Sequence, residues 1–99
     1  MNDHASVVRV ARHVPAAGRR DEVAGVLKSA AEAAREAAGC FGAQVASSDR
    51  EPDQVVLISR WESTEAMKTF HSQPDFTSLQ RTIQDSLVGQ PAVEVLTTA

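Results

Sequence analysis

The sequence predicts an α+β domain in which helices cover one face of a four-stranded antiparallel sheet. Four short stretches have the alternating or β-branched pattern of strands. Helical stretches, with apolar residues three and four positions apart, stand between the first and second and between the third and fourth of these strands. The chain has 99 residues, the length of one domain, so we expect residues 1–99 to form a single folding unit.

Residues 6–14 and 19–38 are predicted to be the first strand and the first helix. The strand alternates two sets of side chains, with Val8, Val10 and Val14 on one side and Val7, Ala11 and His13 on the other. The helix carries one apolar stripe, formed by Val23, Val26, Leu27, Ala30 and Ala34. Acidic residues near its start suit the helix dipole, and Gly39 is a stop signal after its end.

Residues 40–47 and 54–61 are the predicted second and third strands, joined by a turn rich in Asp and Pro. The third strand is apolar on both sides. One side consists of Val55, Leu57, Ser59 and Trp61, and the other consists of Val56, Ile58 and Arg60.

A pair of helices and a last strand complete the chain. Ser63 can cap a helix over residues 64–72. Pro74 breaks that helix and opens another, which runs until a Gly89 stop. The apolar face of this second helix consists of Phe76, Leu79, Ile83 and Leu87. With residues 92–97 as the last strand, the element order is that of the ferredoxin-like fold, whose first crossover is right-handed.

Helices on one face leave the other face of such a sheet bare. The first and third strands would place four aliphatic side chains on it, Val8, Val10, Val56 and Ile58. An apolar patch of this kind is large for a monomer, and face-to-face packing of two sheets about a twofold axis would cover it. The residue pattern therefore predicts a homodimer.

Composition excludes several classes of partner. The formal net charge of −3 argues against a nucleic-acid-binding face, which would be basic. No apolar run approaches the length of a membrane span, and residues 1–6 lack the basic start and apolar core of a signal peptide. The single cysteine, Cys40, has no thiol partner in the chain and is expected to be buried and inert. We therefore expect a cytoplasmic protein that binds neither nucleic acid nor membrane.

Three short motifs link the chain to a known family. Residues 55–67 read VVLISRWESTEAM, residues 72–76 read SQPDF and residues 38–42 read AGCFG. They resemble the Trp-Glu-Ser strand end, the Ser-Pro-His-Phe helix break and the Pro-Gly-Cys-Leu-Gly strand start of the antibiotic biosynthesis monooxygenase family. The resemblance extends from Val7 to Leu96.

The resemblance implies a dimeric α+β barrel. In the better-known branch of the family, small oxygenases convert a phenol or hydroquinone to a quinone with molecular oxygen and use no metal, haem or flavin. The sequence is consistent with this, because it contains neither a glycine-rich nucleotide loop nor metal-ligand spacing among its three histidines. We expect no cofactor and no metal.

The quinone-forming branch implies a site of four residues. Its strand-ending Trp and the Arg twenty residues later correspond to Trp61 and Arg81. Its Asn and Tyr positions hold Leu57 and Met67 here, so half of the set is replaced. A second branch degrades haem with an Asn, a Trp and a His, and the matching positions hold Ala11, Phe70 and Gln80. We therefore do not expect haem degradation.

Trp61, Arg81 and His71 are the candidate catalytic residues. Trp61 could line a pocket or simply fill the core, and Arg81 could stabilise a phenolate or pair with Asp85 on the same helix. His71, with an ordinary pKa near 6.5, could remove a phenolic proton or lie in solvent at a helix end. The candidate pocket residues, each of which could equally be structural, are Leu57, Ser59, Met67, Phe70, Phe76 and His13.

The leading functional hypothesis is a cofactor-independent monooxygenase for a small, flat, aromatic phenol, quinol or polyketide-like substrate, with O2 as the second substrate. The alternative is a non-enzymatic, small-molecule-binding or stress-related dimer of the same fold, which the Leu57 and Met67 replacements favour. An accessory domain that stabilises a partner enzyme is a third hypothesis.

Overall fold

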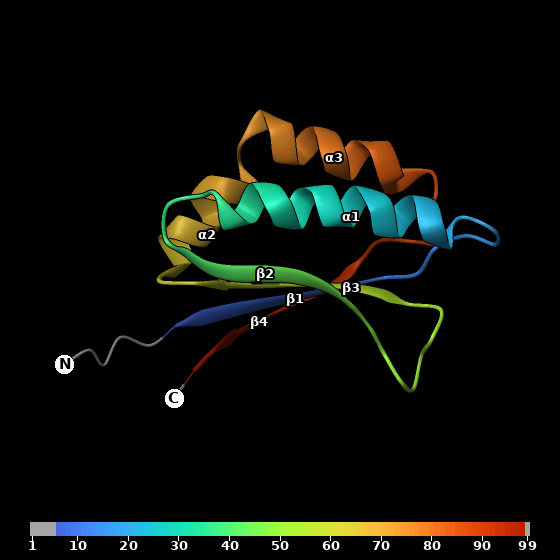
Figure 1. Ribbon diagram of the computed structural model, residues 1–99, viewed down its shortest axis with the longest axis horizontal. Helices are drawn as coiled ribbons and strands as arrows, with labels where there is room; N and C mark the ends of the chain where they lie inside the picture. The colour runs from blue at the N-terminus through green and yellow to red at the C-terminus, as the bar shows by residue number, and fades with distance from the viewer. Residues whose placement is uncertain (1–5, 99) are drawn as a thin grey trace.

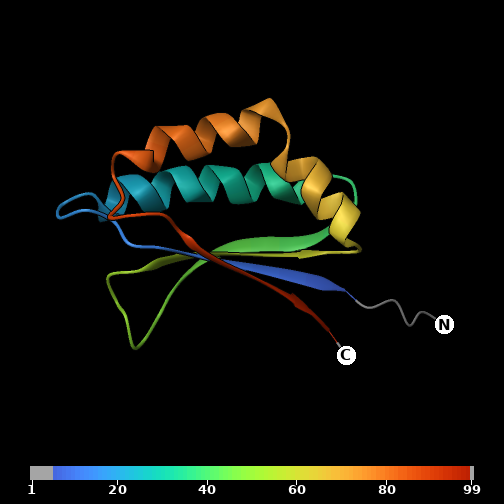
Figure 2. The same cartoon turned by 180° about the vertical axis from the view of Figure 1, so that it is seen from behind.

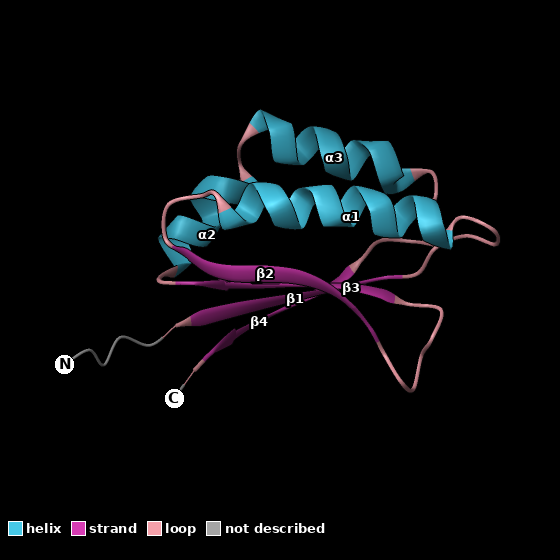
Figure 3. Ribbon diagram, viewed as in Figure 1, coloured by secondary structure: helices cyan, strands magenta, loops and turns pink. Residues whose placement is uncertain are grey.

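The computed structural model describes residues 6–98. The elements follow one another as β1 (Val7–His13), α1 (Arg20–Arg35), β2 (Cys40–Ser47), β3 (Val55–Trp61), α2 (Thr64–His71), α3 (Pro74–Gln84) and β4 (Ala92–Thr97). Figure 3 shows these helices and strands by colour. The predicted α+β, ferredoxin-like order is confirmed.

The four strands form one antiparallel sheet in the order β2-β3-β1-β4. Figure 1 shows α1 and α3 side by side over one face of this sheet, with α2 at one end of that layer, and Figure 2 shows the same arrangement from behind. The opposite face carries no helix in either view. The β2–β3 connection, residues 48–54, bends toward that uncovered side.

The core lies between the sheet and the helices. Strand pairing brings Val7 opposite Trp61 and Ala11 opposite Leu57, and these four side chains are all at most 4% exposed. The predicted stripe of α1 packs onto them through Val23, Leu27, Ala30 and Ala34, joined by Ala31. The helix-facing rows of the sheet are therefore the ones that the apolar alternation of the sequence predicted.

Two helix ends differ from the sequence prediction. The α1 helix ends at Arg35 rather than at residue 38, because Glu36 and Ala37 already form i to i−3 bonds and Gly39 then takes a left-handed φ of +81°. The α3 helix ends at Gln84, so Leu87 does not belong to its apolar face. Leu87 instead forms a bridge with Pro15, and the neighbouring Val88 N–H donates to the Val14 carbonyl at 2.7 Å.

The β2 strand contains an irregularity where the sequence has glycine. Its pairing with β3 shifts register between Cys40 and Gly42, as at a β-bulge. Cys40 itself is half-buried rather than fully buried as predicted, and its thiol donates to the Gly42 carbonyl at 3.5 Å. The side chain still packs against the core cluster, at the irregular start of this edge strand.

The uncovered face has the aliphatic character that the sequence predicted. Val10 lies opposite Ile58 in the centre of the sheet, and Val8 lies opposite Leu96 of β4, which is 45% exposed. Val56 is 7% exposed although it belongs to this face. Apolar side chains therefore form the part of the uncovered face over β1 and β3, while Glu94 of β4 lies opposite Val10 and pairs with Arg12 at 3.5 Å.

Candidate functional site

A cavity of about 180 Å³ lies between the helix-facing side of the sheet and the helices α1 and α3. Most of its wall is apolar: α1 contributes Val26, Leu27 and Ala30, α3 contributes Phe76, Leu79 and Ile83, and the strands contribute Leu57 and Val93. Polar groups reach it from Arg9, His13, Gln80 and Gln90. An apolar cavity with a few polar groups is the usual form of a small-molecule site.

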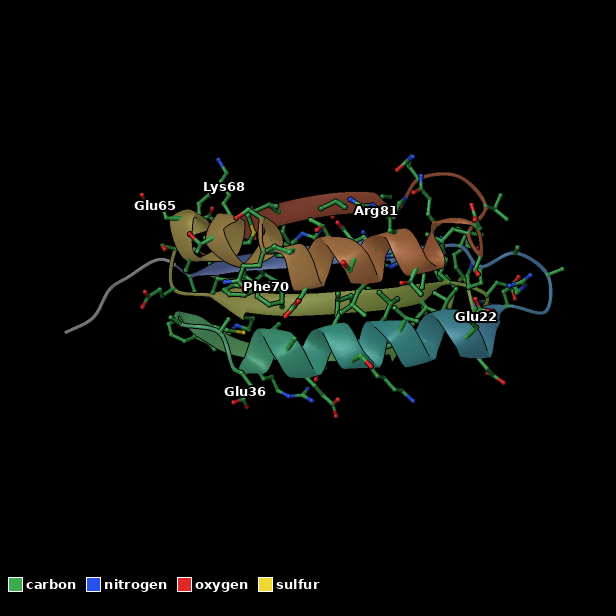
Figure 4. All side chains as sticks on the ribbon, turned by 90° about the horizontal axis from the view of Figure 1, so that it is seen from above. Glu22, Glu36, Glu65, Lys68, Phe70 and Arg81 are labelled. Atoms are coloured by element: carbon green, nitrogen blue, oxygen red, sulfur yellow. The ribbon has the colours of Figure 1, made fainter. Side chains whose placement is uncertain are left out.

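A second, more open cavity of about 310 Å³ adjoins the first. The two share wall residues, namely His13, Gln80, Ile83, Gln90 and Pro91. Arg81 lines only the second cavity, and Figure 4 shows it on the side of α3 that is turned away from α1. We call the first the inner cavity and the second, more open one the outer cavity.

His13 stands at the junction of the two cavities. The β1 strand ends at this residue, and its side chain is 6% exposed. Its Nδ1 lies 3.1 Å from the carbonyl oxygen of Val55, its cross-strand partner, so Nδ1–H donates and Nε2 keeps its lone pair. Burial lowers the pKa of His13 below its ordinary value. The Val55 hydrogen bond opposes this shift, and the positive charge of Arg9 adds to it. The cavity thus contains a neutral imidazole at pH 7.

Arg9 is a site residue that sequence reasoning missed. It lies on the same side of β1 as Val7, Ala11 and His13, between buried neighbours, and its guanidinium carbon is 6.0 Å from the centre of the Phe76 ring. Burial lowers the pKa of the guanidinium from its ordinary value, which still leaves the group charged at pH 7. The signal was a charged residue at a core position of the strand alternation.

A cluster of aromatic side chains lies behind the cavity. Trp61 is fully buried, and its indole N–H donates to the Ser59 hydroxyl at 2.9 Å. Its ring centre is 5.4 Å from that of Phe70, which in turn is 5.1 Å from Phe76. In Figure 4, Phe70 lies among the side chains between the α2–α3 pair and α1. Phe76 is therefore the residue through which this cluster meets the cavity.

His71 belongs to this cluster. Its Nδ1–H donates to the Met67 carbonyl at 2.7 Å, and its ring stands at 90° to Phe76 with a centre-to-centre distance of 4.5 Å. Burial first, and the charge of Arg9 second, lower its pKa from 6.5 to about 4. At neutral pH the ring is uncharged and packs as an aromatic residue.

The lowered pKa of His71 predicts acid sensitivity. The unfolded chain binds a proton near pH 6.5 but the folded chain only near pH 4, so the free energy of unfolding should fall as pH drops through this window and level off below it. His71→Gln should make this fall in the free energy of unfolding smaller. Part of the fall should remain in the variant, because the pKa of His13 is also lowered in the folded chain. Urea-unfolding midpoints of the wild type and of His71→Gln, each at about pH 7 and about pH 4, measure the effect. An equal drop of the midpoint between these pH values in the two proteins would contradict it.

The structure distributes the predicted site residues over three places. Leu57, Phe76 and His13 line the inner cavity, and Arg81 lines the outer one. The remaining predicted residues are in the packed cluster and not on either wall: Trp61, Ser59, Met67, Phe70 and His71. Among residues 6–98 the ion pairs are Arg12–Glu94 and Arg19–Glu22, so Arg81 does not pair with Asp85.

Neither a metal site nor a membrane span is evident in the described part of the chain. No group of three or more His, Cys, Asp or Glu side chains within residues 6–98 is placed to hold a metal ion. No helix in the same residues is long and apolar enough to cross a membrane.

Comparison with known sequences agrees with this architecture. The sequence profile of the family described as antibiotic biosynthesis monooxygenase matches residues 6–82, which include β1 to α3 nearly in full. The chain belongs to this family. No curated protein sequence matches it.

Solved structures share the fold of this family member. The protein Rv0793 from Mycobacterium tuberculosis is 23% identical, with a TM-score of 0.84 over 92% of each chain. A conserved protein from Methanosarcina mazei is 14% identical, with a TM-score of 0.89 over 97% of this chain and 95% of its own. A candidate antibiotic biosynthesis monooxygenase from Bordetella bronchiseptica is 20% identical, with a TM-score of 0.81 over 96% and 98%. At these identities the likeness establishes the fold alone.

Proposed function

We propose that this family member is a cofactor-independent monooxygenase that oxidises a small phenolic, quinol or polyketide-like aromatic substrate with O2. The observation that carries the proposal is the cavity itself, an apolar chamber with one neutral imidazole and one guanidinium on its wall. Family membership supports a monooxygenase-like activity. The proposal extends this to a substrate class and to a mechanism without a cofactor.

The proposed reaction begins with removal of the phenolic proton. The phenolate is electron-rich and gives electrons to O2. With a phenol or an anthrone, one oxygen atom ends as the new quinone oxygen, and with a quinol it ends as a hydroxyl group on the quinone ring; in each case the other oxygen leaves as water with two hydrogens from the substrate. The protein would contribute position, exclusion of water and stabilisation of the anion. The apolar wall around Leu57, Leu79 and Phe76 suits the first two roles, and a cation suits the third.

His13 is the better candidate for the base. The sequence favoured His71, but His71 packs against Phe76 behind the wall and has a pKa of about 4, which makes it a weak base. His13 lines both cavities, and its Nε2 is free of the Val55 hydrogen bond. We propose that His13 takes the phenolic proton. Arg81, on the outer cavity, would be a second cationic contact for the substrate anion, in addition to Arg9 on the inner cavity.

The test is oxygen uptake by the metal-stripped protein with a panel of anthrone-type and hydroquinone substrates. His13→Gln should lower kcat/KM by about 100-fold, the usual effect of losing a general base, whereas His71→Gln should retain most of the activity. Arg81→Ala should raise KM more than it lowers kcat. Uptake no faster than buffer across the panel would overturn the proposal, and equal losses in both histidine variants would remove His13 as the base.

A non-enzymatic ligand-binding protein is the second candidate. The observation in its favour is that Leu57 and Met67 stand where the quinone-forming branch has a hydrogen-bonding Asn and Tyr, and Leu57 lines the cavity. Such a protein would hold a quinol unchanged. Recovery of the bound compound after aerobic incubation distinguishes the two candidates.

We further propose that two copies pack through the uncovered sheet face and that the dimer works in the cytoplasm. Aliphatic residues along β1, β3 and β4 lie on this face, and exposed apolar area of this kind favours association. A twofold axis would make the face its own complement.

A further inference from the structure

We propose that Arg9 binds an acidic group of the ligand, so that the compound taken by the cavity is an aromatic anion of the aryl carboxylate type. The inference rests on the proposed function in one respect only, that the cavity is the site. It adds a substrate class that neither the family nor the sequence motifs specify.

The first observation is the position of Arg9. On the helix-facing side of β1 its neighbours Val7 and Ala11 are 4% and 1% exposed. Its cross-strand partner on β3, Ser59, is 2% exposed, and its partner on β4, Val95, is 46% exposed. Strand alternation therefore directs the side chain inward, where it is half-buried and lines the cavity. A charge in this place carries a desolvation cost that an apolar residue would avoid.

The second observation is that this charge has no counter-ion among residues 6–98. The two ion pairs within residues 6–98 involve Arg12 and Arg19, and neither cavity has an Asp or Glu on its described wall. The groups near the guanidinium are the Phe76 ring and the two histidines whose pKa it lowers. All three are neutral at pH 7, so an anion in the cavity would be the first full negative charge beside Arg9.

Guanidinium geometry specifies the kind of anion. Its planar fork forms two parallel hydrogen bonds with a carboxylate, and such charge-assisted bonds are among the strongest in proteins. The aromatic part of the ligand suits the apolar residues of the wall, which include Phe76, while the other polar residues on the wall, His13, Gln80 and Gln90, carry no full charge at pH 7. An apolar cavity of about 150 Å³ admits benzene, so the inner cavity with its open neighbour suits a compound of one or two rings.

The test compares, by calorimetry under argon, two probes of nearly the same shape, 2-naphthoate and 2-naphthamide, in which a carboxylate oxygen is replaced by a neutral amide NH2. Wild-type protein should bind the naphthoate at least about 10-fold more tightly than the amide. Arg9→Gln should weaken naphthoate binding by about 10- to 100-fold and leave the amide unchanged, and Arg9→Lys should fall between. Lys28→Gln, which removes an exposed charge from the outer side of α1, is the matched control and should bind as wild type.

Thermal unfolding separates a ligand role from a packing role. If Arg9 serves the ligand, Arg9→Gln without ligand should melt at or above the wild-type temperature, because a desolvated charge has been removed. Naphthoate should then raise the melting temperature of the wild type and not of the variant. A variant that unfolds at lower temperature yet keeps the naphthoate preference would assign Arg9 to packing and overturn the proposal.

Two other results would also overturn it: no binding of naphthoate to wild-type protein, or equal binding of the acid and the amide. Both experiments proceed without oxygen and without turnover. Arg9-dependent naphthoate binding in a protein with no oxygen uptake would therefore leave this inference standing and remove the proposed monooxygenase activity. Oxygen uptake with no preference for naphthoate over naphthamide would support the proposed monooxygenase activity and overturn the Arg9 inference.

Discussion

Replacing Trp61 with Ala is expected to lower the free energy of unfolding by about 3–5 kcal/mol, the usual cost of deleting a buried Trp. The side chain is fully buried, packs on Phe70 at a ring distance of 5.4 Å and satisfies its N–H through Ser59. A domain of this size has a total stability of about 5–15 kcal/mol, so the variant should be marginal or unfolded. Urea unfolding followed by circular dichroism measures the difference.

The Trp61–Ser59 hydrogen bond provides the matched controls. Trp61→Phe keeps most of the apolar volume but leaves the Ser59 hydroxyl without the indole donor, and Ser59→Ala leaves the indole N–H without an acceptor. Each should cost about 1–3 kcal/mol, the range for a buried polar group that loses its partner. A loss below about 1 kcal/mol in Trp61→Ala would show that the surrounding cluster collapses to fill the space.

Val10→Asp is expected to convert the proposed dimer to a monomer. Val10 lies in the centre of the uncovered sheet face, opposite Ile58 on β3 and Glu94 on β4. A second carboxylate beside Glu94, whose partner Arg12 is already engaged, would lose its hydration in a face-to-face dimer, which costs several kcal/mol and should weaken association by about 1000-fold or more. Light scattering coupled to gel filtration, over a range of protein concentrations, measures the mass.

Ser29→Asp adds the same charge to an exposed position on α1 and should leave the assembly state unchanged. The two variants differ in the face that they modify, so a change of mass in Val10→Asp alone supports packing through the sheet. A wild-type protein that is monomeric at all concentrations would contradict the dimer. A Val10→Asp variant that remains dimeric would show that the interface lies on another surface.

Local sequence patterns were sufficient for the elements and their order. The alternation in β1 and β3, the apolar stripe of α1 and the Ser63 cap, whose hydroxyl accepts from the Ala66 N–H at 3.1 Å, all occur as predicted. Each depends on neighbours within one turn of helix or one strand. The end of α3 was wrong because it depends on residues 14–16, which bind the chain beyond Gln84 and lie far away in sequence.

The residues of the candidate site could likewise be predicted from the sequence only in part. The residue types and the family resemblance were sufficient to select Leu57, Phe76 and His13, all of which line the inner cavity, and Arg81, which lines the outer one. They could not separate these from Trp61, Ser59 or His71, because spacing along a strand or helix assigns a face but not a depth. Depth depends on how α1 and α3 close over the sheet.

By itself, then, the sequence determined the α+β element order, the core-facing sides of β1 and β3 and the aliphatic character of the uncovered face, since these follow from periodicity in a local stretch. The tertiary structure alone decided that a cavity remains between α1, α3 and the sheet and that His13 rather than His71 lines it. It also decided that Arg9 lies on the wall with no carboxylate from residues 6–98 beside it. The physical reason is that a cavity and the charge balance of its wall arise from side chains on several elements at once, and no single stretch of sequence contains them.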